Sequence, residues 1–184
     1  MMNILVSAQA GAQLGSLLVF VAIARWYVAP WLSARGRAEA LIALLWLHVF
    51  RYVALQVFAA QHEGFPASTD VALEIAIGDV GGAALAFAAI VLLRQRAFAG
   101  ILVSWILVIE TITDTILNIR GGIEEHLMGA ATGVVWMILM FFVPAVVVGI
   151  GLIAGQLITR RHEALAADRR NHEPFGAGLP QGHT

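Results

Sequence analysis

Long apolar stretches separated by short polar segments make up most of this sequence, and five of them are long enough to cross a membrane. Each holds about 20 or more mainly apolar residues, the length that an α-helix needs to span the hydrocarbon core. The five predicted spans are Ala8–Val28, Glu39–Gln61, Val71–Leu93, Phe98–Ile119 and Leu127–Thr159. The pattern therefore predicts an all-α integral membrane bundle of five transmembrane helices.

The composition agrees with a membrane protein and excludes several other classes. The chain of 184 residues is 60% hydrophobic and 12% charged, with a mean hydropathy of +0.83, which leaves too little polar surface for a soluble domain. Cysteine is absent, which excludes disulfides, thiolate metal sites and cysteine nucleophiles. A net charge of −1 gives no reason to expect nucleic-acid binding. We expect one transmembrane domain over residues 1–160 and a polar, partly disordered cytoplasmic tail over residues 161–184.

The arginines predict how the bundle is oriented. Pairs of arginines follow the first, third and fifth spans, whereas the segments after the second and fourth spans hold one arginine and several acids. Because positive charge is retained on the cytoplasmic side, the N-terminus should lie outside and the C-terminus inside, most simply in a bacterial inner membrane. The three pairs are Arg35 and Arg37, Arg94 and Arg96, and Arg160 and Arg161.

Two carboxylates lie one helical turn apart inside the fourth predicted span. These are Glu110 and Asp114, and Asn118 continues the same helical face by one more turn. A charged side chain in hydrocarbon costs at least about 2.5 kcal/mol, so it persists mainly where it meets another charge, water or a ligand. This face is therefore a candidate functional site.

The second and third spans bring further polar groups to the same depth. His48 and Arg51 lie near the middle of the second span at a spacing that puts them on one face, and Glu74 and Asp79 belong to the third span. All of these positions fall between the middle of the bilayer and its outer surface. We therefore expect a cavity that opens toward the outside, with His48 and Arg51 at its floor.

The simplest interpretation of these charges is structural. Arg51 could form an ion pair with Asp79, Glu110 or Asp114 that fixes how the helices pack. Four acids face only one deep arginine, however, so we expect at least one carboxyl group to hold a proton. Such a proton could be delivered to a substrate or exchanged across the membrane.

Metal and cofactor sites are poorly supported. His48, Glu110 and Asp114 could form a His-carboxylate metal site, but the neighbouring charge of Arg51 disfavours a cation there. A bis-histidine haem needs two deep histidines, and only His48 is deep. We therefore predict no metal and no cofactor.

Two glycine pairs predict close helix packing. Gly78 with Gly82, and Gly151 with Gly155, form GxxxG steps, which serve contacts within a chain or between the subunits of a homodimer. Pro144 in the fifth span should free a backbone carbonyl group and kink that helix.

The run from Glu74 through Leu93-Arg94-Gln95 to Asp114 resembles the EXPERA domain of emopamil-binding proteins, which include the sterol Δ8–Δ7 isomerase. His48 in the second span and Pro144 in the fifth agree with the layout of that family. The resemblance covers about forty residues well. It implies a five-helix bundle with a cavity for a rigid hydrophobic molecule, and it carries His48 and Glu74 over as site residues.

The chain departs from the family pattern at four positions. Tyr52 and Ile77 stand where the family has a glutamate and a threonine, and Met137 and Met140 stand where it has an asparagine and a tryptophan. The resemblance therefore implies the cavity rather than sterol isomerisation.

Together these patterns predict a membrane protein that binds a hydrophobic, sterol-, isoprenoid- or lipid-like molecule in an intramembrane pocket with a polar floor. Its sharper form is an acid–base isomerase or cyclase, and the alternatives are a proton- or cation-coupled transporter and an accessory subunit of a membrane complex. The candidate catalytic residues are His48, Glu74, Glu110 and Asp114, and the candidate ligand-binding residues are Arg51, Tyr52, Asp79, Asn118 and Trp136.

Overall fold

The computed structural model describes residues 2–163 and residue 165, and within these residues the secondary structure is entirely helical. The prediction of an all-α chain is thus confirmed over the described part, and the predicted disorder of the tail concerns residues that mostly lie outside it. The helical segments are α1 (Met2–Ile23), η1 (Ala24–Val28), α2 (Ala29–Ser33), α3 (Arg37–Val49), η2 (Phe50–Leu55), α4 (Gln56–His62), α5 (Thr69–Arg94), α6 (Ala99–Glu124), α7 (Gly133–Met137), η3 (Ile138–Phe142) and α8 (Val143–Thr159).

These segments join into five continuous helices that are long and apolar enough to cross a membrane, which confirms the predicted number. The fifth begins later than the sequence predicted, because the chain after α6 forms a turn in which His126, Gly129 and Gly133 have positive φ. The five helices are Ile4–Ser33, Arg37–His62, Thr69–Arg94, Ala99–Glu124 and Gly133–Thr159.

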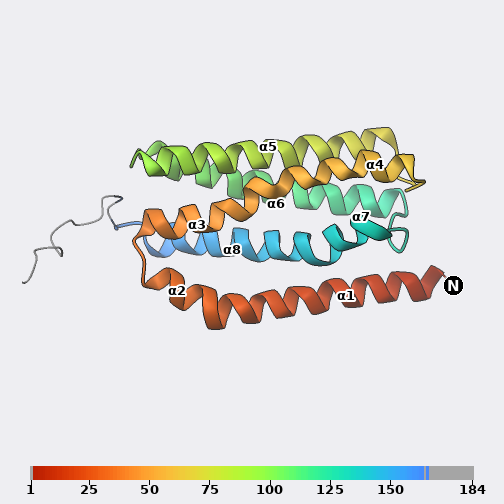
Figure 1. Cartoon of the computed structure of the whole chain (residues 1–184), viewed down its shortest axis with the longest axis horizontal. Coiled ribbons are helices and arrows are strands. Elements are labelled where there is room, and N and C mark those ends of the chain that lie inside the picture. Colours follow the sequence, from red (N-terminus) through yellow and green to blue (C-terminus); the bar gives the residue numbers. More distant parts are fainter. Residues whose placement is uncertain (1, 164, 166–184) are drawn as a thin grey trace, which may run out of the picture.

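The helices alternate in direction along one long axis (Figure 1). Four of them pack into a bundle in which α5 contacts both α3 and α6, and α8 contacts both α3 and α6. The first helix lies along α8 and η3 at one side of this bundle. Only 6% of its most apolar 18-residue stretch is buried, compared with 33–39% of the same stretch in the other four helices. The core of the fold is therefore a four-helix bundle, and α1 is peripheral.

The apolar core fills the half of the bundle where α3 and α6 begin and α5 and α8 end. Alanines and a glycine make up much of the buried face of α5, so the backbones of neighbouring helices can approach closely. The fully buried core side chains include Leu41, Leu45, Ile90, Leu93, Leu107, Ile153 and Leu157.

Irregular turns interrupt three of the five helices. Residues Phe50–Leu55 form a 3₁₀ helix, and π-helical turns at Ala24–Val28 and Ile138–Phe142 each come just before a proline. Pro144 has no N–H group and its ring crowds the carbonyl of Met140, so a widened turn relieves the contact. The predicted disturbance at Pro144 therefore takes the form of a π-helical turn.

A group of charged residues joins the start of α3 to the end of α8. Arg37 is buried and donates to the carbonyl oxygen of Leu157 at 3.3 Å, and Arg160 donates to that of Arg35 at 2.6 Å. Glu163 accepts a hydrogen bond from Arg160 at 2.6 Å and another from the backbone N–H of Arg37 at 3.2 Å. The hydrogen bonds from Arg160 hold the pKa of the Glu163 carboxyl below its usual value. We refer to these residues as the Arg37–Arg160–Glu163 cluster.

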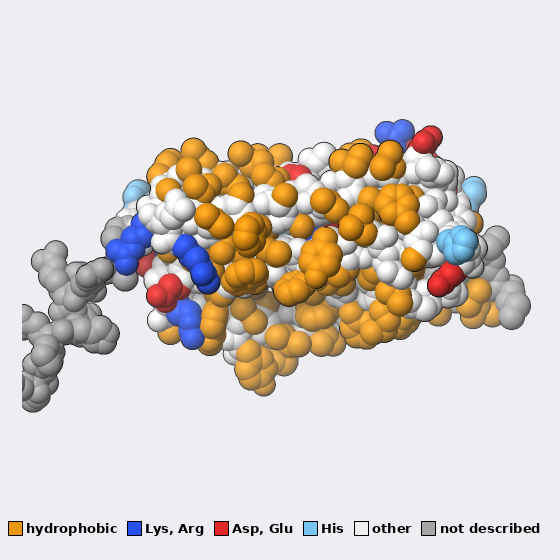
Figure 2. All heavy atoms as spheres, turned by 45° about the horizontal axis from the view of Figure 1, so that its top comes forward, with side chains coloured by type: hydrophobic (Ala, Val, Ile, Leu, Met, Phe, Trp, Pro, Cys, Tyr) orange, Lys and Arg blue, Asp and Glu red, His pale blue; other side chains and the backbone are white. Residues whose placement is uncertain are grey.

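Charged side chains gather mainly toward the two ends of the molecule, and apolar side chains dominate the surface between them (Figure 2). This distribution suits helices whose middle sections face hydrocarbon.

Candidate functional site

Arg51 is the centre of a polar cluster in the middle of the bundle. Its Nε donates to Asp79 Oδ1 at 2.7 Å, its Nη1 to Glu110 Oε2 at 2.7 Å, and its Nη2 to Asp114 Oδ2 at 2.6 Å. Nη1 also donates to Thr111 Oγ1 at 2.8 Å. The guanidinium fork thus engages carboxylates from both α5 and α6. We call these five residues the Arg51 cluster.

The position of Arg51 in the fold explains why three acids can reach it. Its side chain is only 1% exposed and comes from η2, the 3₁₀ segment in the middle of its helix. Asp79 belongs to α5, whereas Glu110 and Asp114 lie one turn apart on α6. The planar, permanently charged guanidinium presents five donors, which lets it bind several carboxylates at once. The structure therefore confirms that Arg51 meets the acids that the sequence offered as its partners.

Two glycines of α5 make room for this cluster. A Cβ atom on Gly82 would lie 2.0 Å from Arg51 Nη1, and one on Gly78 would lie 1.9 Å from Asp114 Oδ1. The Gly78–Gly82 step therefore serves contacts within the chain, and its space is already filled. The other step is open, because a Cβ on Gly151 or Gly155 would meet no atom of the described residues within 4 Å. A homodimer through Gly151 and Gly155 stays a prediction.

The charges in the Arg51 cluster do not balance. One guanidinium faces three carboxyl groups, so the fully ionised cluster would carry two negative charges more than positive ones. The side chains of Asp79, Glu110 and Asp114 are between 10% and 22% exposed, so water screens them little. The excess negative charge favours a proton or another positive group at this place.

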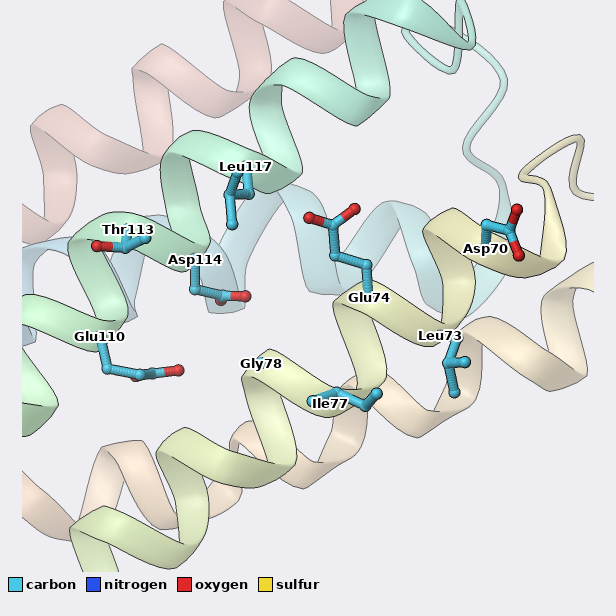
Figure 3. A pocket seen from close by; sticks show the side chains of 9 residues that line it. All are labelled: Asp70, Leu73, Glu74, Ile77, Gly78, Glu110, Thr113, Asp114 and Leu117. Carbon is cyan, nitrogen blue, oxygen red and sulfur yellow. The ribbon is translucent and has the colours of Figure 1, made fainter.

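A groove of about 620 Å³ between α5 and α6 opens onto the cluster. In Figure 3, Glu110 and Asp114 point from α6 toward α5, and Glu74 points from α5 toward α6. Ile77 and Leu73 are exposed and form apolar walls beside these acids. The groove is lined by Asp70, Leu73, Glu74, Ile77, Gly78, Glu110, Thr113, Asp114 and Leu117.

This groove differs from the expected cavity in its floor. Glu110, Asp114 and Gly78 line it, while Arg51 lies behind the two acids and does not itself line the groove. The expectation of an acid-rich polar surface agrees with this geometry, and the expectation that His48 and Arg51 form the floor does not.

His48 lies apart from the Arg51 cluster. Its side chain is fully buried, and its Nε2 would be 3.2 Å from a Cβ on Gly149 of α8. Neither ring nitrogen has a hydrogen-bond partner within the described residues. The short imidazole thus stays beside α8, whereas the longer side chain of Arg51 reaches α5 and α6. The helical spacing predicts that His48 and Arg51 leave their helix on one face. It does not predict that their side chains reach different neighbouring helices.

Tyr52 lines a second groove on another side of the bundle. This groove has a volume of about 790 Å³ and is bounded by α1, η2, η3 and the ends of α7 and α8. Its lining is mainly apolar and includes Phe20, Met137 and Phe141. Tyr52 is 48% exposed there. It does not line the α5–α6 groove, where the acidic partners of Arg51 lie.

The three remaining candidates lie in three different places. Asn118 lies beside the Arg51 cluster, and its Nδ2 donates to Asp114 Oδ2 at 3.2 Å. Trp136 lies elsewhere and packs edge-on against Phe141, with ring centroids 6.2 Å apart. Glu74 is exposed in the groove and near Arg120, which forms an ion pair with Glu124.

Sequence reasoning overlooked Thr111. Its hydroxyl lies between Arg51 Nη1 and Glu110 Oε2, at 2.8 and 3.2 Å. A threonine in an apolar helix usually bonds to its own backbone, so residue type alone gave no signal. Its position beside Glu110 in the chain was the available clue. In the part of the chain that the structure describes, no group of three or more acidic or histidine side chains has the arrangement of a metal site.

The fold and the site define an all-helical protein with five helices of membrane-spanning length and a buried arginine–carboxylate cluster beside a groove. Over residues 9–158 the chain matches the family described as Domain of unknown function (DUF8737), and it belongs to that family. No curated protein and no solved structure matches the chain.

Proposed function

We propose that this protein is inserted in a membrane, with its N-terminus outside and its C-terminus in the cytoplasm of a bacterial cell, and binds a hydrophobic molecule in the α5–α6 groove. The five apolar helices support insertion, and the arginines at the ends of α5 and α8 support the orientation. The groove lies toward the start of α5, which this orientation puts in the outer half of the bilayer.

The observation that carries the proposal is the pairing of apolar walls with a carboxylate floor. Ile77 and Leu117 offer surface for the apolar body of a ligand, while Glu110 and Asp114 can accept hydrogen bonds from its polar end. A volume of about 620 Å³ falls in the range of small-molecule sites, roughly 300–1,000 Å³. A sterol-, isoprenoid- or lipid-like molecule has this combination of a large apolar body and one polar end.

An acid–base reaction is the sharper form of this proposal. A protonated Glu110 or Glu74 would donate its proton to an alkene carbon of the ligand, and an ionised neighbour such as Asp114 would stabilise the resulting cation or remove a different proton. His48 lies beside α8, so this form assigns it no proton transfer in the groove.

The test is to fill the groove with a side chain. Ile77 and Ile116 are similarly exposed, at 64% and 61%, but only Ile77 lines the groove. The protein is purified in mild detergent and the lipids that stay with it are measured by mass spectrometry. Ile77→Trp should reduce the retained ligand at least about tenfold, which corresponds to about 1.4 kcal/mol, whereas Ile116→Trp should retain it. Equal retention by both variants would exclude the α5–α6 groove as the binding site.

A proton- or cation-coupled carrier is the second candidate, and the excess of carboxyl groups around Arg51 favours it. Glu110→Gln keeps the shape of the side chain but cannot exchange a proton. In liposomes with a trapped pH dye, a carrier would dissipate a proton gradient when wild type is present and fail to do so with this variant. A bound lipid without proton flux supports the binding protein instead. If neither is found, an accessory subunit becomes the better explanation.

A further inference from the structure

One end of the bundle carries almost all of the arginines. Seven arginines and two acids occur where α1, α5 and α8 end and α3 begins, and the opposite end has one arginine and five acids, counted over the described residues. The arginines of the basic end are Arg25, Arg35, Arg37, Arg94, Arg96, Arg160 and Arg161, and its acids are Glu39 and Glu163. The molecule is therefore strongly polarised along its long axis.

Four of these arginines form what we call the basic surface: Arg35, Arg94, Arg96 and Arg161. Three of them are exposed and Arg35 is half-buried, and none pairs with a carboxylate inside the described ranges. Arg37 and Arg160, by contrast, are occupied with helix-end carbonyls and Glu163. Arg35 donates one hydrogen bond to the carbonyl oxygen of Trp31 and Arg161 one to His162 Nε2, both at 3.0 Å. Each guanidinium has five N–H donors, so all four arginines keep donors that can bind an anionic partner.

Arg96 occupies a position that usually belongs to glycine. It lies two residues after the end of α5 with φ +58°, and the N–H of Ala97 donates to Leu92 O at 3.0 Å in the manner of a Schellman motif. The same motif ends α4, and there the residue with positive φ is Gly64. A side chain in this conformation strains the backbone. The α5–α6 turn therefore holds an arginine where glycine would be more stable.

Exposed aromatic side chains occur at the same end of the bundle as the basic surface. The guanidinium of Arg35 lies over the ring of Trp31, 3.4 Å from its centroid. Trp26 in η1 and Phe98 in the α5–α6 turn are 70% and 67% exposed. Tryptophan is enriched where a membrane meets water, so in an inserted protein Trp26 and Trp31 would lie at the interface on this side.

We infer that the basic surface binds the phosphate headgroups of anionic phospholipids in the leaflet that it faces. Unpaired arginines near a membrane surface attract anionic lipids, and each contributes about a fivefold change in affinity. The planar guanidinium also binds phosphate oxygens in a bidentate manner. This inference depends on membrane insertion but not on the α5–α6 groove or on what that groove binds.

The experiment compares lipids on the full-length protein. Phosphatidylglycerol or phosphatidylcholine is titrated onto the detergent-purified chain, and bound lipid is counted by native mass spectrometry. Wild type should prefer phosphatidylglycerol, and the double variant Arg94→Gln with Arg96→Gln should lose at least about tenfold of that preference. Arg120→Gln is the matched control, because Arg120 is an exposed arginine at the opposite end. It should leave the preference unchanged.

A second variant separates lipid binding from folding. Arg96→Gly removes the charge and also relieves the backbone, so it should raise the melting temperature while weakening phosphatidylglycerol binding about fivefold. A merely structural arginine would not show these opposite effects.

Three results would overturn the inference. These are equal binding of the two lipids by wild type, an equal loss from Arg120→Gln, and displacement of phosphatidylglycerol by millimolar inorganic phosphate, which would indicate a site for soluble anions. Failure of membrane insertion itself would be seen separately, as release of the protein from membranes at alkaline pH.

Discussion

Arginine ties helices together at two places in this molecule, and it does so with different partners. In the Arg51 cluster, one buried guanidinium meets three carboxyl groups on α5 and α6. In the Arg37–Arg160–Glu163 cluster, two arginines bind mainly to backbone carbonyls at the ends of helices, and one exposed acid assists them. The first cluster has an excess of negative charge and the second an excess of positive charge.

The difference concerns what each arginine leaves behind when it is removed. Carbonyl groups at a helix end near water can be solvated again at modest cost. Carboxylates inside a bundle cannot be, and an ion pair that is broken on one side leaves a charge without compensation. The end cluster therefore supports the fold, whereas the Arg51 cluster makes the fold depend on its charge state.

The largest effect should come from Arg51 itself. Arg51→Leu removes the counter-charge of Asp79, Glu110 and Asp114, and we expect it to lower the free energy of unfolding by about 3–5 kcal/mol. Arg160→Leu at the end cluster should cost clearly less. Thermal unfolding of both variants in the same detergent measures the difference, and equal losses would contradict the contrast between the clusters.

Adding Asp114→Asn to Arg51→Leu tests whether the two residues act together. The second change removes one of the stranded charges, so it should restore part of the lost stability. Additive losses in this double-mutant cycle would show that Arg51 and Asp114 do not interact as the 2.6 Å contact implies.

The next effect concerns the room that glycine gives to the Arg51 cluster. Gly82→Ala would place a Cβ 2.0 Å from Arg51 Nη1, and the ion pairs leave that side chain little freedom to move. We expect a loss of about 1–3 kcal/mol. Gly81→Ala is the matched control, because a Cβ there meets no described atom within 4 Å, and it should be neutral or stabilise the helix by up to about 1 kcal/mol. Thermal unfolding compares the two, and similar results from both would contradict the close packing.

The spans and the acidic partners of Arg51 were predictable because both follow from periodicity. Apolar runs of fixed length give the helices, and acids one turn apart give a shared face, as with Glu110 and Asp114. Alternating direction then brings polar groups at the same depth together. Span length and periodicity each concern a single helix, and alternating direction concerns only the depth of a residue in the membrane.

The rest of the site depends on how helices are rotated against one another, which periodicity does not specify. The sequence showed Gly78 and Gly82 as a packing surface but not that Arg51 and Asp114 fill it. It placed His48 and Tyr52 near Arg51, whereas the 3₁₀ turn at Phe50–Leu55 and the packing of α8 direct them elsewhere. No glycine or proline marks that 3₁₀ turn, so it left no signal in the sequence.

His48 is a third buried side chain with a basic group, and among the described residues it has neither a carboxylate nor a backbone carbonyl as a partner. Because neither ring nitrogen is hydrogen-bonded within the described residues, His48→Leu should not repeat the loss expected of Arg51→Leu. We expect His48→Leu to change the free energy of unfolding by less than about 1.5 kcal/mol. The change should be an increase, because the substitution removes an unsatisfied polar group. A loss as large as that of Arg51→Leu would mean that His48 has a polar partner, such as a water molecule or a ligand. The unfolding measurement should be made with lipid-depleted protein, so that a bound ligand does not contribute.

The smallest effect should come from Glu163 and should depend on pH. Hydrogen bonds from Arg160 lower the pKa of this carboxyl in the folded chain, so its contribution to stability is present above the unfolded pKa of 4.5 and is lost as the pH falls through the folded pKa. Because Glu163 is an exposed partner, the loss caused by Glu163→Gln should be less than about 1 kcal/mol at pH 7 and should shrink as the pH falls through the folded pKa. Glu39→Gln is the control, because Glu39 is an exposed acid at the same end with no hydrogen-bond partner in the described part of the chain. Melting temperatures of both variants and wild type across this pH range decide the matter. A loss that grows on acidification would show that Glu163 stabilises the folded chain as a neutral group, and the hydrogen bonds from Arg160 would then not explain its role.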